Sequence, residues 1–175
     1  MTEAIITSRL LLRRWTPQDV GEMSEIYADP KTMRWFGFGT VFSQAQVADS
    51  LVSVIAEYAD SGFGNYAIIE RQTTKIIGHC GLHRKYEPDI EVEIDCLVAR
   101  GQWGFGYGTE ASDAVIRQAF LADDVSVISG VAHRENKPAI ALMERLGMSY
   151  VSKRKRFGII SVLYQIGAAS FQGAH

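Results

Sequence analysis

The chain has 175 residues, 47% of them hydrophobic, and a formal net charge of −2 at pH 7. This length and composition are typical of one globular domain with a full core, and they exclude a disordered chain. The charge balance provides no basic field for nucleic acid. No stretch is long and apolar enough for a membrane span or a signal peptide, and the two cysteines are too few for a secreted disulfide scaffold. We therefore expect a cytoplasmic protein, one domain over residues 1–175, that binds neither membranes nor nucleic acid.

The first third of the chain predicts one strand and two helices. Residues 8–15 are rich in leucine and arginine and predict a strand. A helix begins at Thr16, which is followed by a proline suited to the first helical position. Residues 33–42 are aromatic, punctuated by glycine and without periodicity, which favours a loop. Ser43 and Gln46 form a capping box at the start of an amphipathic helix.

The remainder of the chain alternates short apolar runs with helical patterns. In chain order it predicts strands at 66–70, 76–83 and 90–98, a helix at 109–121, a strand at 125–132, a helix opened by Asn136 and closed by Gly147, and strands at 149–152 and 159–166. Helices that lie between strands of one sheet indicate a mixed α/β or α+β domain.

A glycine-rich turn carries the strongest functional signal. Four glycines fall in the eight residues 101–108, directly after a predicted strand and before a predicted helix. Glycine lets a ligand approach main-chain N–H groups closely, and the helix N-terminus behind them attracts anions. We therefore expect a phosphate or pyrophosphate here. The glycine spacing does not fit the dinucleotide pattern, and no Lys-Ser/Thr pair follows, which excludes a Walker A loop. The alternative is a flexible connection without a ligand.

The segment W-G-F-G-Y-G-T-E-A at residues 103–111 resembles the acetyl-CoA pyrophosphate loop of the GNAT superfamily of N-acetyltransferases. It is most similar to the subgroup of ribosomal-protein alanine and serine N-acetyltransferases. Residues 136–148 and 8–13 resemble two further motifs of that subgroup, in family order. The resemblance covers about 8–166 and leaves a tail at 167–175. It implies a mixed, mostly antiparallel central sheet of about six or seven strands, flanked by about four helices, and acetyl-CoA as co-substrate.

The resemblance also implies a path for the cofactor. The pantetheine arm should lie between the strands at 90–98 and 125–132, which a β-bulge near residues 96–98 would splay apart. The cofactor-binding residues that it implies are Cys96, Leu97, Val98, Trp103, Gly104, Phe105, Gly106, Tyr107, Gly108, Thr109 and Asn136. For Asn136 the alternative is a cap of the following helix alone. Met143 stands where many relatives carry a tyrosine that acts as general acid.

Acidic residues share one face of the strand at 90–98. Glu91, Glu93 and Asp95 alternate with apolar residues there. An amine must lose a proton before it attacks a thioester, and a nearby carboxylate can take that proton. The resemblance aligns Glu93 with the strand glutamate that is the general base in several relatives, and Glu91 is the second candidate. The alternative is a solvated face that keeps a sheet edge soluble.

Aromatic residues before the second helix are candidates for the acceptor pocket. The family often places acceptor contacts in this region, which here contains Trp35, Phe36 and Phe38. The equal alternative is that they cap the core. No metal site is expected, because His79 and His83 lack a third ligand on their face.

These observations predict an acetyl-CoA-dependent N-acetyltransferase. The acceptor is a primary amine, either a protein N-terminus or a small molecule, which attacks the thioester directly in a ternary complex. The rival hypothesis is a catalytically inactive acyl-CoA-binding or sensory module, which the methionine at position 143 keeps open. A homodimer is compatible with either hypothesis.

Overall fold

The computed structural model describes residues 4–36, 39–87, 90–122, 125–156 and 158–172. In chain order the elements are β1 (Ala4–Ile6), β2 (Leu10–Arg14), α1 (Val20–Tyr27), α2 (Gln44–Ser61), β3 (Gly64–Glu70), β4 (Ile76–Glu87), β5 (Ile90–Val98), α3 (Tyr107–Leu121), β6 (Val127–His133), α4 (Lys137–Arg145), β7 (Ser149–Arg156) and β8 (Ile159–Gly167). The mixed α/β class is confirmed. The strand expected at 8–15 is instead the second arm of a hairpin with β1, so the sheet has eight strands rather than six or seven.

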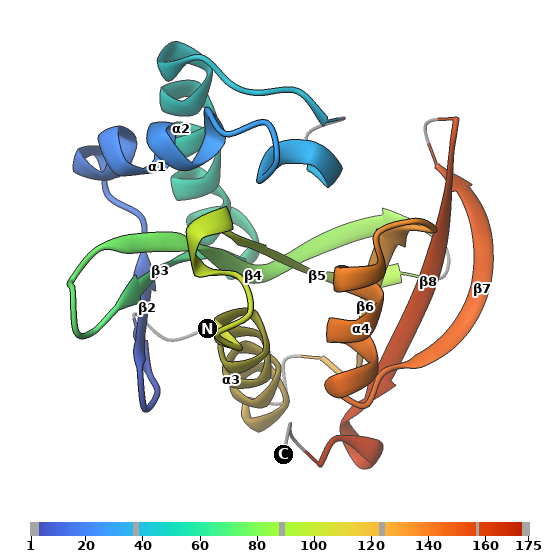
Figure 1. The fold of residues 1–175 in the computed structure, drawn as a ribbon. Helices are drawn as coiled ribbons and strands as arrows, with labels where there is room; N and C mark the ends of the chain where they lie inside the picture. Colours follow the sequence, from blue (N-terminus) through green and yellow to red (C-terminus); the bar gives the residue numbers. More distant parts are fainter. Residues whose placement is uncertain (1–3, 37–38, 88–89, 123–124, 157, 173–175) are drawn as a thin grey trace.

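All eight strands belong to one sheet in the order β1-β2-β3-β4-β5-β6-β8-β7. Every neighbouring pair is antiparallel except β5 and β6. Helices α1 and α2 cover one face of this sheet, and α3 and α4 cover the other (Figure 1). Over the described residues, no helix is both long enough and apolar enough to cross a lipid bilayer.

The parallel pairing of β5 with β6 is short, and the ladder between these two strands does not continue beyond it. Only Glu93 of β5 and Ser129 of β6 are in register as partners. The register between β4 and β5 runs without a shift from Val98 back to Val92, and its irregularity lies between Arg84 and Glu87 of β4. The β-bulge expected near residues 96–98 was therefore wrong for this ladder. The strands separate because the parallel ladder stops after one pair, not because β5 carries an extra residue.

Strict alternation along β5 divides its side chains between two cores. Val92, with its even-numbered neighbours, faces α3 and α4 in the larger cluster. Leu97 faces the other way, into a cluster with Met23 and Ile26 of α1. Because Glu91, Glu93 and Asp95 share the parity of Leu97, the acidic face of β5 lies on the α1–α2 side of the sheet.

Local caps start the helices where the sequence predicts them. The side chains of Ser43 and Gln46 each bond the other residue's backbone N–H, which forms the expected capping box of α2. Before α1, a 3₁₀ turn (Pro17–Asp19) is held by Asp19, which accepts hydrogen bonds from both terminal nitrogens of Arg13 at 2.7 and 2.8 Å. The same carboxylate accepts from the backbone and hydroxyl of Thr16. The turn between β2 and α1 is thus fixed by one buried carboxylate.

Replacing Asp19 by asparagine should lower the free energy of unfolding at pH 7 by about 1–3 kcal/mol, because it removes charge-assisted bonds to Arg13. Burial raises the pKa of Asp19, but the bonds from Arg13 and Thr16 outweigh it and leave the pKa below its usual range. A lowered pKa means that the stabilisation is present above the unfolded value, about 4, and is lost as the pH falls. Urea unfolding at pH 7 and pH 3 should therefore show a difference between wild type and variant that shrinks in acid. An equal difference at both values would contradict this role.

Candidate active site

The glycine-rich turn connects β5 to α3 through a left-handed backbone. Gly104 and Gly106 have φ of +83° and +81°, a conformation that residues with a Cβ rarely adopt. The indole N–H of Trp103 donates to the carbonyl oxygen of Val98 at 2.7 Å and ties the turn to the end of β5. The N–H of Glu110 bonds the carbonyl of Gly106 at 3.1 Å and begins the ladder of α3. The N–H groups of residues 107–109 precede that bond and have no acceptor within the helix, which is the arrangement expected of an anion site at a helix N-terminus.

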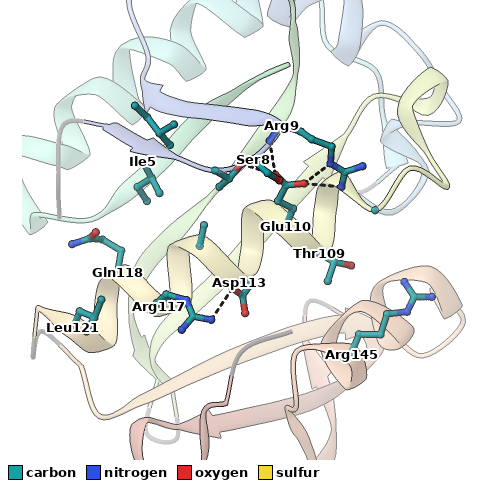
Figure 2. A pocket seen from close by; sticks show the side chains of 14 residues that line it. Ile5, Ser8, Arg9, Thr109, Glu110, Asp113, Arg117, Gln118, Leu121 and Arg145 are labelled. Carbon is teal, nitrogen blue, oxygen red and sulfur yellow. Dashed lines mark hydrogen bonds and ion pairs between the residues drawn. The ribbon is translucent and has the colours of Figure 1, made fainter. Parts of the chain in front are cut away.

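An ion pair fastens this turn to the N-terminal hairpin. Glu110 accepts from the backbone and side chain of Arg9 at 2.9 and 2.7 Å, and from the hydroxyls of Thr7 and Ser8 (Figure 2). Arg9 also donates to the carbonyl of Phe105 at 2.8 Å. The sequence motifs at 8–13 and 103–111 therefore meet in space. The sequence shows both motifs but not this contact, since Arg9 and Glu110 lie 101 positions apart.

A groove of about 690 Å³ runs along α3 beside the turn. It extends from the β1–β2 hairpin across the exposed side of α3, and Figure 2 shows Arg145 of α4 on its opposite side. Its lining includes Gly106, Thr109, Arg9, Arg117 and Arg145. Glu110 and Asp113 also line the groove and pair with Arg9 and Arg117, so the lining carries charges of both signs. The volume of the groove suits a nucleotide-sized group.

Two of the three acids on β5 differ sharply in surroundings. Glu91 is 60% exposed and forms an ion pair with Arg84 at 3.0 Å, away from the point where β5 and β6 part. Glu93 is half-buried and lies in register with His83 of β4 and Ser129 of β6. Of the two predicted bases, Glu93 is thus the one that lies where the parallel ladder ends.

The third acid, Asp95, is the end of a buried polar chain. Nε2 of His79 lies 3.4 Å from its carboxylate, and Nδ1 of the same ring is 3.0 Å from the hydroxyl of Tyr27. Nδ2 of Asn65 lies 3.5 Å from the carboxylate on another side. Burial raises the pKa of Asp95, but the neighbouring His79, His83 and Asn65 outweigh it and bring the pKa to about 2. Nothing in the sequence alone singles out Asp95 among the three acids, and His79 was a candidate there only as a metal ligand. The shared parity of His79 and Asp95 on paired strands is the signal that links them.

The aromatic segment after α1 reaches across the sheet. Phe36 packs on Tyr27 and His79, with ring centroids at 5.6 and 5.3 Å. Trp35, in a 3₁₀ turn (Met33–Trp35), stacks on His133 at the end of β6 at 4.7 Å. The segment thus bridges β4 and β6, the strands on either side of β5. Phe38 lies outside the described residues.

The remaining predicted residues have local structural contacts. Asn136 is the N-cap of α4, and its side-chain oxygen accepts from the N–H of Ala139 at 3.3 Å. Met143 is buried, and a Cβ placed on Gly130 would come within 2.6 Å of its sulfur, so α4 lies close against β6. A thioether has no proton to donate, so Met143 is not a general acid. Cys96 faces α3 near the carbonyl of Gly108, whereas the buried Leu97 faces the opposite cluster.

The comparisons with known proteins agree with this arrangement. Residues 9–149 match the family model of the acetyltransferase (GNAT) domain. The chain is 27% identical to the N-acetyltransferase p20 of Bacillus licheniformis, whose function is uncharacterized, over 82% of this chain and 81% of that protein. A GNAT-family acetyltransferase from Bacillus anthracis superposes with a TM-score of 0.82 at 22% identity, over 95% of this chain and 99% of its own. RimL, the ribosomal L7/L12 α-N-protein acetyltransferase solved with coenzyme A, has a TM-score of 0.82 at 14% identity, over 94% and 98%.

The family match spans most of the chain, and it includes the turn, the acidic strand and the whole of α4. The chain belongs to the GNAT family of acetyltransferases.

Proposed function

We propose that this protein transfers an acetyl group from acetyl-CoA to a primary amine, with Glu93 as general base. The observation that carries the proposal is the position of Glu93, which lies at the last paired position of β5 and β6. Beyond it, residues 94–98 of β5 continue to the anion site of the glycine turn without a partner in register among the described residues of β6. One edge of β5 thus connects a phosphate site to a half-buried carboxylate.

The turn and the groove suit the phosphate end of the cofactor. The N–H groups of residues 107–109 would bind the pyrophosphate, and the groove along α3, with its paired arginines and acids and Arg145, would face the nucleotide end. The open edge of β5 offers backbone N–H and C=O groups to the amide bonds of the pantetheine arm. Cys96, Leu97 and Val98 would contribute through this backbone, since their side chains point to the two faces of the sheet. The hydrogen bonds of Arg9, Trp103 and Glu110 hold the turn in this conformation.

The reaction requires a proton to leave the amine. Glu93 would accept that proton, directly or through water, while the nitrogen attacks the thioester carbonyl carbon. The tetrahedral intermediate then collapses, the C–S bond breaks, and coenzyme A leaves as a thiolate that takes up a proton. Because Met143 has no proton to give, solvent would supply it. The acceptor would approach from the α1–α2 side, beneath Trp35 and Phe36, where the acidic face of β5 lies.

Release of free thiol from acetyl-CoA, measured with a panel of amines, tests the proposal. The panel should include peptides with a free N-terminus and small amines, both of which fit a primary-amine acceptor. Turnover with any of them supports the enzyme. Tight binding of coenzyme A without turnover across the panel would instead favour an acyl-CoA-binding module.

Replacing Asn136 by serine should weaken the use of acetyl-CoA while stability is preserved. We propose that the side-chain nitrogen of Asn136 contacts the pantetheine arm, since its oxygen is engaged with Ala139. Serine keeps most of a helix cap but cannot offer the amide N–H. We expect KM for acetyl-CoA to rise severalfold with a melting temperature within about 2 °C of wild type, which is below the shift for 1 kcal/mol in a chain of this size. Parallel losses of stability and activity would show that Asn136 only caps α4.

A further inference from the structure

The two cysteines of the chain face each other across adjacent strands. Cys80 of β4 and Cys96 of β5 are register partners in the antiparallel ladder, and both are free thiols. Because partners in a ladder point to the same face of the sheet, both side chains belong to the larger core cluster, on the α3 side. Residues that are distant in sequence thus bring two reducing groups to one place beneath α3.

The backbone spacing of these partners suits a disulfide. Directly opposed residues of an antiparallel ladder have Cα atoms about 4.5 or 5.5 Å apart, depending on whether the pair is hydrogen-bonded. Disulfides join residues whose Cα atoms are about 4.4–6.8 Å apart. Either kind of pair falls inside this range, and the ladder around the cysteines has no register shift. A disulfide can therefore form by rotation of the two side chains while the strands stay in register.

The two thiols differ in their surroundings. Cys80 is fully buried, and its sulfur lies 3.6 Å from the hydroxyl oxygen of Ser112 in α3. Burial, with a smaller effect of the neighbouring Cys96 thiol, raises the pKa of Cys80, so that this thiol does not react with an external oxidant by itself. Cys96 is partly exposed. The pair thus combines an accessible thiol with a buried one beside it.

Cys96 also contacts the first turn of α3. Its sulfur lies 3.9 Å from the carbonyl oxygen of Gly108, and a Cβ placed on Gly108 would lie 3.7 Å from the same sulfur. A bond to Cys80 draws this sulfur toward β4 and removes the S–H donor that faces the carbonyl. Gly108 is the middle residue of 107–109, whose N–H groups are proposed to bind the pyrophosphate. Oxidation would therefore change the packing directly beneath that site.

We propose that Cys80 and Cys96 are an oxidation site, at which a peroxide joins them in a disulfide that weakens the binding of acetyl-CoA. The sulfur of Cys96 attacks one oxygen of hydrogen peroxide, the O–O bond breaks, and a sulfenic acid and water form. The sulfur of Cys80 then displaces the sulfenic hydroxyl, which leaves as a second water. The two thiols lose two protons and two electrons, which the peroxide takes up. The effect on acetyl-CoA rests on the proposed function, whereas formation of the disulfide does not.

Mass spectrometry of the peroxide-treated protein tests the disulfide. We expect the chain to lose the mass of two hydrogen atoms, and a tryptic digest without reductant to contain the fragments 76–84 and 86–100 linked together. Dithiothreitol should restore both thiols, whereas it does not reverse oxidation of methionine. Two thiols that stay free, a stable oxygen acid at Cys96 beside a free Cys80, or a link between two copies of the chain would each overturn the inference.

Calorimetry with acetyl-CoA tests the consequence for binding. Acetyl-CoA is the suitable probe, because its sulfur is esterified and cannot reduce the disulfide. We expect the oxidised protein to have a Kd about fivefold higher, or more, than the reduced protein, and dithiothreitol to restore the affinity. An unchanged Kd in protein that carries the disulfide would contradict the proposed effect on the cofactor site.

Cys80→Ser is the matched control. It keeps a small side chain beside Ser112 and removes only the thiol that completes the disulfide. We expect the variant to bind acetyl-CoA as wild type does, before and after treatment with peroxide, and to yield no linked fragments. Equal weakening by peroxide in both proteins would assign the effect to another group and refute the role of the pair. If reduced wild type does not bind acetyl-CoA, the proposed function fails, and the digest still decides whether the two cysteines are joined.

Discussion

Replacing Glu93 by glutamine should lower kcat at pH 7 by about 10²–10⁴, the range for loss of a general base. The variant should bind acetyl-CoA as tightly as wild type, because the hydrogen bonds that hold the glycine turn come from Arg9, Trp103 and Glu110. The acidic limb of the pH profile of kcat/KM should disappear or move. The loss should also shrink as the pH rises, because a growing fraction of the amine is then already deprotonated and needs no base.

Glu91→Gln is the matched comparison for this experiment. It makes the same chemical change on the same face of β5, but at an exposed residue that is paired with Arg84. We expect its kcat to stay within about twofold of wild type. If Glu93→Gln is the variant that stays within twofold and Glu91→Gln is impaired, the base is Glu91. If both variants retain activity, His133, which stacks under Trp35, is the next candidate.

Replacing Gly106 by valine should raise the dissociation constant of coenzyme A by tenfold or more, about 1.4 kcal/mol. Gly106 is the N-cap of α3 and has φ of +81°, which is strained for a β-branched residue. A shift of this backbone would displace the N–H groups of residues 107–109. Isothermal titration calorimetry with coenzyme A measures the effect directly, without any acceptor amine.

Gly108→Ala is the control for the glycine turn. A Cβ at this position would meet the sulfur of Cys96 and a methyl of Val98 at 3.7 Å, which is ordinary van der Waals contact. The affinity for coenzyme A should therefore change by less than about twofold. An unchanged affinity in a folded Gly106→Val protein would show that the turn does not bind the pyrophosphate.

Local signals predicted most of the fold. The capping box at Ser43, the proline after Thr16 and the glycine at the end of α4 mark real helix boundaries, because each reflects chemistry within one turn of the helix. The predicted ends of the strands were less accurate than those of the helices. The strand expected at 149–152 continues to Arg156 as β7, since pairing with β8 extends the strand beyond its apolar part.

The same distinction between local and long-range effects applies to the candidate site. The turn at 101–108 and the alternation around Glu93 were readable because the informative residues are neighbours in sequence. The surroundings of Asp95 were not, because they bring together Tyr27, His79 and Asn65 from three other elements. The termination of the β5–β6 ladder is a property of the sheet, and no single segment contains a signal for it.

The hydrogen-bond network of Glu110 couples the β1–β2 hairpin to α3. It joins the β1–β2 hairpin to the helix that would hold the cofactor, because the Glu110 carboxylate accepts from Arg9, and Arg9 also donates to the carbonyl of Phe105 in the glycine turn. A ligand that rigidifies α3 should also slow the opening of the hairpin. Amide hydrogen exchange in residues 4–14 should thus slow on addition of coenzyme A, although these residues need not touch the nucleotide. The amino-terminal hairpin would then serve as a remote reporter of occupancy.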